Sequence, residues 1–210
     1  MTLRLIRSDA CLTEGMAWLS SHEPRFAGAY RLTGPLPLRL RADGFGALLD
    51  AIVSQQVSVA SARAILARMQ AAGLSSEEAI RGVGEDDLRA AGLSRQKARY
   101  VKALADAALD YPALREAPTG EVVAQLTALP GIGRWTAEIY AMFALGHADV
   151  FAPADLALQE SARRLFGLET RPNERALRQL AETWSPWRAV AARLLWAYYR
   201  VDKGREGIIG

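Results

Sequence analysis

The sequence predicts an all-α protein whose helices form two lobes that flank a cleft. Apolar residues recur at helical spacing in nearly every segment, as in Phe45, Leu48, Leu49 and Ile52, which share one helix face. Serines that suit N-caps precede several of these segments, and glycines follow them. The stretch 36–41 alternates like a strand, but proline precedes and interrupts it, which disfavours a place inside a sheet.

The expected helices follow one another without a repeat or a flexible linker. In chain order they span 45–53, 58–71, 76–81 and 85–91, a long segment from 94 that ends before Pro112, a short one around 122–126, and then 133–145, 155–166, 173–183 and 186–201. Residues from about 45 to 146 are expected to form a central lobe. The two ends, 1–44 and 147–210, are expected to meet in a second lobe of the same domain, and a cleft between lobes is a common ligand site.

Composition describes a globular chain with a basic balance. The 210 residues are 50% hydrophobic, enough for a sizeable core. The net charge is +3, and of the 26 basic residues only Lys97, Lys102 and Lys203 are lysines. Arginine binds phosphate through two parallel hydrogen bonds, so this balance supports a nucleic-acid partner. A GC-rich genome would give the same arginine content.

Cysteine and histidine usage narrows the chemistry. Cys11 is the only cysteine, so no intramolecular disulfide and no cysteine-ligated zinc or iron–sulfur site is expected. His22 and His147 are too few to form a ligand cluster. No apolar run approaches the roughly 20 residues that span a bilayer, and residues 1–9 do not resemble a signal peptide. A cytoplasmic protein without a membrane partner is expected.

A proline and two glycines separate two expected helices in the middle of the chain. The first helical run stops at Pro130, Gly131 and Gly133 bracket Ile132, and a second helix starts near Arg134. Glycine lets a bulky partner approach the backbone, and a helix N-terminus offers unpaired N–H donors that suit a phosphate. The pattern indicates a helix-hairpin-helix motif that holds a nucleic-acid backbone without reading its sequence. An ordinary helix–helix turn with a glycine C-cap is the alternative.

An aspartate and two tryptophans are the candidates for chemistry. Asp155 follows Pro153 at the start of an expected helix, where aspartate is commonly an N-cap. The same position favours the charged carboxylate, which suits stabilisation of an oxocarbenium-like sugar. Trp135 lies in the first turn after the hairpin, and Trp196 stands off the apolar stripe of the last helix. Both are either core aromatics or flat walls for a planar ligand such as a nucleobase.

Two polar segments are candidates for contacts with nucleic acid. Gln55 and Gln56 lie in a turn between two strong helices, where they either face water or enter a base stack. Residues 94–99 place three cations at a helix start, which is either a solvated face or a phosphate-contacting patch.

Several ordered motifs together resemble a known family. They are Ala51-Ile52-Val53-Ser54-Gln55-Gln56-Val57-Ser58-Val59-Ala60, Ala91-Gly92-Leu93-Ser94-Arg95-Gln96-Lys97-Ala98, Leu129-Pro130-Gly131-Ile132-Gly133-Arg134-Trp135-Thr136-Ala137, Phe151-Ala152-Pro153-Ala154-Asp155, Trp184-Ser185-Pro186-Trp187-Arg188 and Leu194-Leu195-Trp196. From about 45 to 199 the chain resembles the helix-hairpin-helix-GPD superfamily of DNA glycosylases, and within it the 3-methyladenine DNA glycosylase II type. It resembles a compact form without the N-terminal β-domain of larger members.

The resemblance implies roles for individual residues. It makes Asp155 the catalytic carboxylate, and it places Gln56 in the gap that a flipped base leaves. The base pocket would be formed by Trp135, Trp196, Ile139 and Leu156. DNA would be bound, besides Gln56, by Ser58, Gly131, Gly133, Arg134 and Thr136. Backbone carbonyls of Thr127, Leu129 and Ile132 would hold a structural Na⁺ or K⁺, with no other cofactor.

The resemblance also implies a reaction. Relatives with lyase activity carry lysine where this chain has Trp135, so a monofunctional enzyme is expected. It would hydrolyse the N-glycosidic bond of alkylated purines, of the 3-methyladenine or 7-methylguanine type, flipped from duplex DNA. Its partner would be double-stranded DNA with damaged bases, bound by a monomer at the bacterial nucleoid. The alternatives are a glycosylase for uracil or hypoxanthine, and a non-catalytic DNA-binding module.

Overall fold

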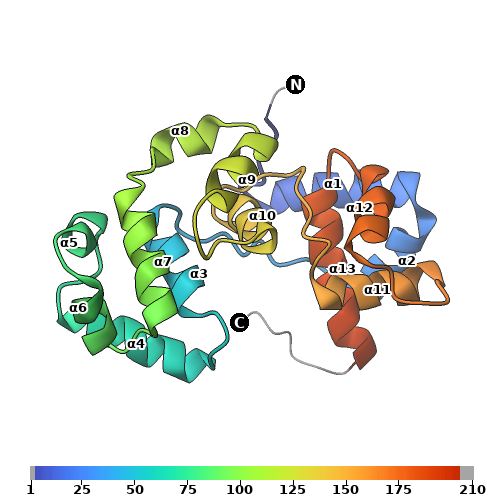
Figure 1. The fold of residues 1–210 in the computed structure, drawn as a ribbon. Coiled ribbons are helices and arrows are strands. Elements are labelled where there is room, and N and C mark those ends of the chain that lie inside the picture. The colour runs from blue at the N-terminus through green and yellow to red at the C-terminus, as the bar shows by residue number, and fades with distance from the viewer. Residues whose placement is uncertain (1–2, 204–210) are drawn as a thin grey trace. The chain divides into compact units, whose positions relative to one another are not determined.

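The computed structural model describes residues 3–203, and within them the chain is helical (Figure 1). It contains thirteen helices in this range and no strand beyond an isolated bridge between Leu5 and His147. The predicted all-α class is confirmed. No helix of the described range is long and apolar enough to cross a membrane. The chain divides into two compact units: residues 41–140 form the central unit, and residues 1–40 with 141–210 form the terminal unit.

The central unit is organised around one long helix. Its helices are α3 (Phe45–Val53), α4 (Val59–Ala71), α5 (Glu77–Arg81), α6 (Glu85–Ala90), α7 (Arg95–Asp106), α8 (Tyr111–Glu116), α9 (Thr119–Thr127) and the start of α10 (Arg134–Phe143). Helix α7 packs against α3, α5 and α6 through a stripe that includes Val101 and Leu104. The side chains of Ser58 and Ser94 accept hydrogen bonds from the first turns of α4 and α7, so these two predicted caps are present, and Ser76 caps α5 in the same way.

The terminal unit is organised around the last helix. It contains α1 (Asp9–His22), α2 (Pro24–Thr33), α11 (Leu156–Phe166), α12 (Glu174–Glu182) and α13 (Arg188–Lys203). Helix α13 packs against α1, α2 and α11. Trp184, 2% exposed, lies among the rings of Phe26, Phe151 and Phe166 at centroid distances of 5.3, 5.3 and 5.6 Å. This aromatic cluster anchors the segment that precedes α13.

Two features of the fold differ from the expected helices. The helix expected from Ser94 is present as α7, but it ends at Asp106 rather than just before Pro112, and Ala108 adopts a φ of +45°. Pro112 instead lies in the first turn of α8, where its missing N–H costs nothing. The helices α1, α2 and α8 were not anticipated. In α1, Gly15 dilutes the apolar pattern. A Cβ at Gly15 would lie 2.7 Å from Val190, so this glycine lets α1 and α13 pack closely.

Candidate functional site

The hairpin of the central unit has the predicted helix-hairpin-helix arrangement. Helix α9 ends at Thr127, the turn closes with a hydrogen bond from Ile132 N–H to the Leu129 carbonyl (3.2 Å), and α10 begins at Arg134. Gly131 adopts a φ of +86°, and a Cβ there would lie 2.3 Å from the Tyr100 ring. Gly131 is therefore required by packing inside the protein, whereas a Cβ at Gly133 meets nothing within 4 Å. The exposed backbone at Gly133 is the open part of the turn.

The glutamine turn after α3 is attached to this hairpin. The side-chain amide of Gln55 donates a hydrogen bond of 2.8 Å to the Gly131 carbonyl. The next residue, Gln56, is exposed and adopts a φ of +55°. A residue with a Cβ loses roughly 1–2 kcal/mol in this left-handed conformation, so the attachment at Gln55 holds Gln56 in a strained backbone. Sequence reasoning did not foresee this strain, because positive φ is usually signalled by glycine or asparagine.

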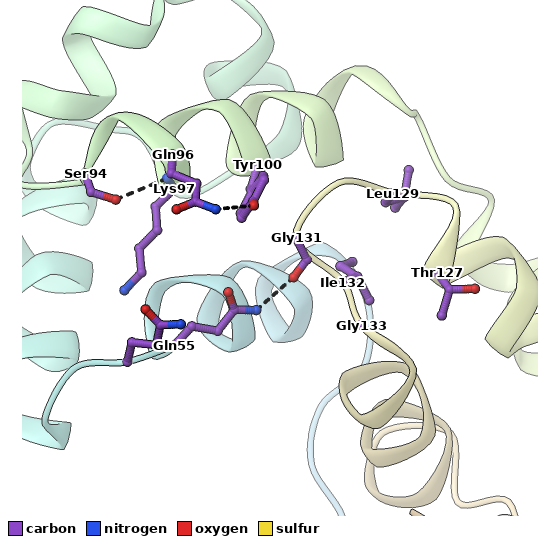
Figure 2. A pocket seen from close by; sticks show the side chains of 11 residues that line it. Gln55, Ser94, Gln96, Lys97, Tyr100, Thr127, Leu129, Gly131, Ile132 and Gly133 are labelled. Carbon is purple, nitrogen blue, oxygen red and sulfur yellow. Dashed lines mark hydrogen bonds between the residues drawn. The ribbon is translucent and has the colours of Figure 1, made fainter. Parts of the chain in front are cut away.

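A pocket of about 560 Å³ lies between the hairpin, the glutamine turn and the start of α7 (Figure 2). We call it the hairpin pocket; it is lined by Gln55, Gln56, Ser94, Gln96, Lys97, Tyr100, Thr127, Leu129, Gly131, Ile132 and Gly133. The structure thus brings together three segments that the sequence presented separately. Tyr100 is the lining residue that sequence reasoning missed; its ring lies against Gly131, and its hydroxyl accepts a hydrogen bond from the Gln96 amide.

Local contacts hold Lys97, which lines the hairpin pocket, and two of the predicted DNA-binding residues near it, Arg134 and Ser58. The Lys97 ammonium donates to the Val53 carbonyl at the end of α3 (2.7 Å), and partial burial lowers the pKa of Lys97. Arg134 is largely exposed and pairs with Glu138 one turn further along α10 (3.0 Å). The Ser58 hydroxyl accepts from Ser61 N–H (3.1 Å) as the cap of α4. Ser58 therefore has a structural role that does not require DNA.

Asp155 of the terminal unit is the N-cap of α11. Its Oδ1 accepts hydrogen bonds from the backbone N–H groups of Ala157 (2.9 Å) and Leu158 (3.0 Å). The indole N–H of Trp196 donates to the same oxygen at 3.3 Å. We call this group of Asp155, Trp196 and the start of α11 the Asp155 site. The capping role and a catalytic role are compatible, because the bonds hold a half-buried carboxylate in a fixed orientation.

The segment before Asp155 is clamped to α13. The Arg188 guanidinium binds both carboxylate oxygens of Asp149, with Nε–Oδ1 at 2.6 Å and Nη2–Oδ2 at 2.9 Å. The Ser185 hydroxyl donates to the same carboxylate (2.8 Å), and the Gln159 amide donates to the Pro153 carbonyl (2.8 Å). A two-pronged arginine–carboxylate pair restricts orientation as well as distance. This clamp was missed from the sequence, because 39 residues separate its two charged partners.

The predicted pocket residues fall into both units. In the terminal unit, Trp196 is only half-buried while its neighbour Leu195 is fully buried, which confirms that it stands off the apolar stripe. Leu156, next to Asp155, is 61% exposed. Trp135, 39% exposed, and the half-buried Ile139 lie one turn apart on α10 within the central unit. The exposure of Trp135 and Leu156 leaves apolar surface available to a ligand.

The side chains do not suggest a transition-metal centre. Among residues 3–201, whose side chains the structure describes, no group of three or more His, Cys, Asp or Glu residues is arranged to hold a metal ion. The His147 imidazole is fully buried, and burial lowers its pKa to about 4.

Comparison with known proteins assigns the class. The profile of the HhH-GPD superfamily, base excision DNA repair proteins, matches residues 49–186. The chain belongs to this superfamily, and the resemblance seen in the motifs is confirmed. DNA-3-methyladenine glycosylase 1 of Schizosaccharomyces pombe is 29% identical over 197 residues, which cover 88% of this chain and 86% of the relative.

Two solved structures share the fold at similar identity. The DNA-3-methyladenine glycosidase of Bacillus halodurans superposes with a TM-score of 0.79 at 29% identity, covering 96% of this chain and 93% of the other. The 3-methyladenine DNA glycosylase of Schizosaccharomyces pombe, solved in complex with abasic DNA, gives a TM-score of 0.73 at 26% identity over 90% of this chain and 97% of the other.

Proposed function

We propose that the protein is a base-excision DNA glycosylase that hydrolyses the N-glycosidic bond of alkylated purines, of the 3-methyladenine or 7-methylguanine type. The observation that carries this proposal is Asp155, whose carboxylate is oriented by two backbone N–H groups and the Trp196 indole. The substrate class is supported by the names of the relatives, which are 3-methyladenine glycosylases.

One oriented carboxylate suffices for this reaction. An alkylated purine is cationic and leaves without prior protonation, so the second carboxylic acid of ordinary glycosidases is dispensable. As the bond breaks, the purine leaves as a neutral base with the bonding electrons, and the Asp155 carboxylate stabilises the positive charge that develops on the sugar. Water then adds to the same sugar carbon and releases one proton, which leaves an abasic site. The bonds to Ala157 and Leu158 fix the carboxylate before the substrate arrives, which avoids reorganisation during the reaction.

The flipped base requires flat, electron-rich walls. The Trp196 ring is held next to Asp155 by its own hydrogen bond, and Leu156 offers apolar surface in the same segment. An indole face attracts a cationic base more strongly than a neutral one. We infer that Trp196 and Leu156 contact the flipped base. The same role for Trp135 and Ile139 stays a prediction from the family resemblance.

The hairpin pocket and the first turn of α10 would bind the DNA backbone. The exposed backbone at Gly133 and the first turn of α10, with Arg134 and Thr136, would bind phosphates without reading sequence. The strained, exposed Gln56 would enter the gap left by the flipped base, and Ser58 would support that turn. Strain of this kind commonly marks a functional position.

A monovalent cation would stabilise the hairpin. Thr127, Leu129 and Ile132 line one pocket around the turn, and the Gly131 carbonyl between them is already bound by Gln55. Backbone carbonyl oxygens are suitable ligands for Na⁺ or K⁺, and the family resemblance assigns the carbonyls of these three residues to such an ion. The bound ion would add a positive charge beside the phosphate contacts.

The proposal is tested by release of free bases from duplexes that contain methylated purines, uracil or hypoxanthine, and from undamaged duplex. We expect release mainly from methylated DNA by a monomer, with an intact abasic site as the product. Strand breaks should appear only after alkali, because tryptophan at position 135 cannot form a Schiff base. Faster release of uracil or hypoxanthine than of methylated purines would show that the substrate is one of those bases instead. Binding of DNA without release of any base would show that the protein is a non-catalytic DNA-binding module.

A further inference from the structure

Arg193 on α13 is buried in the core of the terminal unit without a carboxylate among its hydrogen-bond partners. Its exposed fraction is 3%, and no other lysine or arginine of the described side chains is buried. Burial, with a smaller effect of the nearby Arg39 charge, lowers the pKa of Arg193 to about 10, so the side chain stays protonated at neutral pH. A buried charge is costly, and an apolar side chain of similar volume would avoid that cost.

Three backbone carbonyls hold the guanidinium. Nη1 donates to Ala189 O (2.9 Å), Nη2 donates to Met142 O (3.4 Å), and Nε and Nη2 share Leu38 O (3.4 and 3.3 Å). These carbonyls belong to α13, to the end of α10 and to the segment after α2. One side chain therefore ties together three parts of the terminal unit that are distant in sequence.

The same guanidinium lies over the ring of Phe143, the last residue of α10. Its central carbon is 4.6 Å from the ring centroid, and the ring is almost fully buried. Phe143 is thus held through its own ring and through the carbonyl of the preceding Met142. A cation over a phenyl face in a desolvated place is a favourable contact with a defined geometry.

Phe143 in turn supports the indole that binds Asp155. Its ring centroid is 5.7 Å from that of Trp196, with the ring planes tilted by 32°. The bond from Trp196 to Asp155, at 3.3 Å, is near the long limit for an N–H···O hydrogen bond. A small rotation of the half-buried indole would break it, so the wall that Phe143 provides decides whether the bond forms.

We propose that Arg193 is a positioning residue for Asp155, acting through Phe143 and Trp196. The inference rests on the proposed role of Asp155. Arg193 fixes the Phe143 ring, the ring limits the rotation of Trp196, and the indole N–H stays directed at Oδ1 of Asp155. The hydrogen bonds of Arg193 reach neither the carboxylate nor the indole, so its positioning effect passes through the packing of Phe143 against Trp196.

The test is Arg193→Met, read through the indole N–H resonances of the five tryptophans in ¹⁵N-labelled protein, with Trp196→Phe to identify the signal of Trp196. We expect the Trp196 signal to shift and its N–H to exchange faster with water. The single-turnover rate of base release should fall on the order of 10- to 100-fold, because small misplacements at a reacting centre have effects of that size. Affinity for DNA with an abasic-site analogue should stay at the wild-type value.

Leu177→Ala is the matched control, because Leu177 is fully buried on α12 of the same unit and belongs to none of these contacts. It should lower Tm while leaving the Trp196 signal unchanged. Phe143→Leu removes the ring between Arg193 and Trp196 and tests the second step if Arg193→Met does not fold. Because loss of a neighbouring ring shifts the Trp196 resonance by itself, this variant is read only through hydrogen exchange, and its Trp196 N–H should exchange faster with water than in the wild type.

A wild-type exchange rate of the Trp196 N–H in Arg193→Met, or in Phe143→Leu where only that variant folds, would overturn the proposal even if activity fell. A shifted signal with a wild-type rate of base release would overturn it as well. Failure of the wild-type protein to release any base would instead contradict the proposed function. The resonance experiment would still report whether Arg193 positions the indole.

Discussion

The hairpin pocket and the Asp155 site are built in opposite ways. The hairpin pocket is lined by polar side chains and exposed backbone, and hydrogen bonds such as Gln55 to Gly131 hold its turns. In the Asp155 site, by contrast, three hydrogen bonds orient one carboxylate. Buried aromatic rings and the Asp149–Arg188 ion pair support the surrounding segments. Binding any DNA backbone requires accessible donors, whereas bond cleavage requires a fixed geometry. This contrast supports the proposal that the central unit binds the DNA backbone and that the terminal unit carries out bond cleavage.

The largest expected effect concerns the carboxylate. Asp155→Asn should lower the single-turnover rate of base release on the order of 10³-fold, because the charge that stabilises the sugar cation is lost. Asparagine is also a good N-cap, so Tm should change little. Release of 3-methyladenine is followed by chromatography on a defined methylated duplex. If this nearly isosteric variant kept most of its activity, Asp155 would not be the catalytic carboxylate.

The next effect concerns the hairpin. Gly131→Val should lower the free energy of unfolding by about 3 kcal/mol or more. The valine side chain would clash with the Tyr100 ring, and valine does not tolerate the positive φ at this position. The displaced turn should weaken binding to every DNA sequence alike, measured by fluorescence anisotropy with undamaged duplexes.

Gly133→Ala is the control for this change, because its Cβ has open space. Gly133→Ala should have the wild-type Tm but a lower affinity for undamaged duplex, because the methyl group would keep a phosphate further from the backbone. If Gly131→Val lost activity but bound undamaged DNA normally, the hairpin would not be the anchor.

Acid should destabilise the terminal unit through His147. Burial lowers the pKa of His147 to about 4 in the folded state, against an ordinary value of 6.5. Its contribution is fully present above pH 6.5 and is lost as the pH falls toward 4, because the unfolded chain takes up the proton first. At pH 5 the loss is on the order of 1–2 kcal/mol. Urea unfolding at pH 7 and pH 5 should show this loss in wild type and a smaller one in His147→Gln; equal losses would exclude His147 as the cause.

The smallest expected effect concerns Gln56. Gln56→Ala should weaken binding to abasic-analogue DNA by roughly 1 kcal/mol, because a glutamine that fills the gap offsets part of the cost of unstacking. Intact duplex should be bound as before, since its bases remain stacked. Affinities are compared at matched salt. A solvated turn glutamine, the alternative, predicts the wild-type affinity for both duplexes.

Local signals in the sequence predicted much of the fold. The serine caps of α4 and α7, the Pro–Gly turn of the hairpin and the N-cap position of Asp155 depend on residues within a few positions of one another. These features were predicted correctly, because short-range backbone chemistry decides them. Pro112 misled the prediction, since a proline both ends one helix and starts the next.

Contacts between distant residues could not be read from the pattern. Trp196 reaches Asp155 across 41 residues, and Gln55 reaches Gly131 across 76. Arg193 looked like one more arginine in a helix, although it is buried against carbonyls from three segments. Periodicity places such a residue on a helix face, but only the fold shows what surrounds that face.

The most direct test of the account measures Asp155→Asn and Gln56→Ala side by side, for base release and for affinity, on the same methylated and abasic-analogue duplexes. The account predicts that Asp155→Asn loses base release while keeping or raising affinity, since a negative charge leaves a DNA-binding protein. Gln56→Ala should lose affinity for the abasic analogue and slow release far less than Asp155→Asn. If both variants lost rate and affinity in the same proportion, the proposed division of catalysis and DNA binding between the two units would be contradicted.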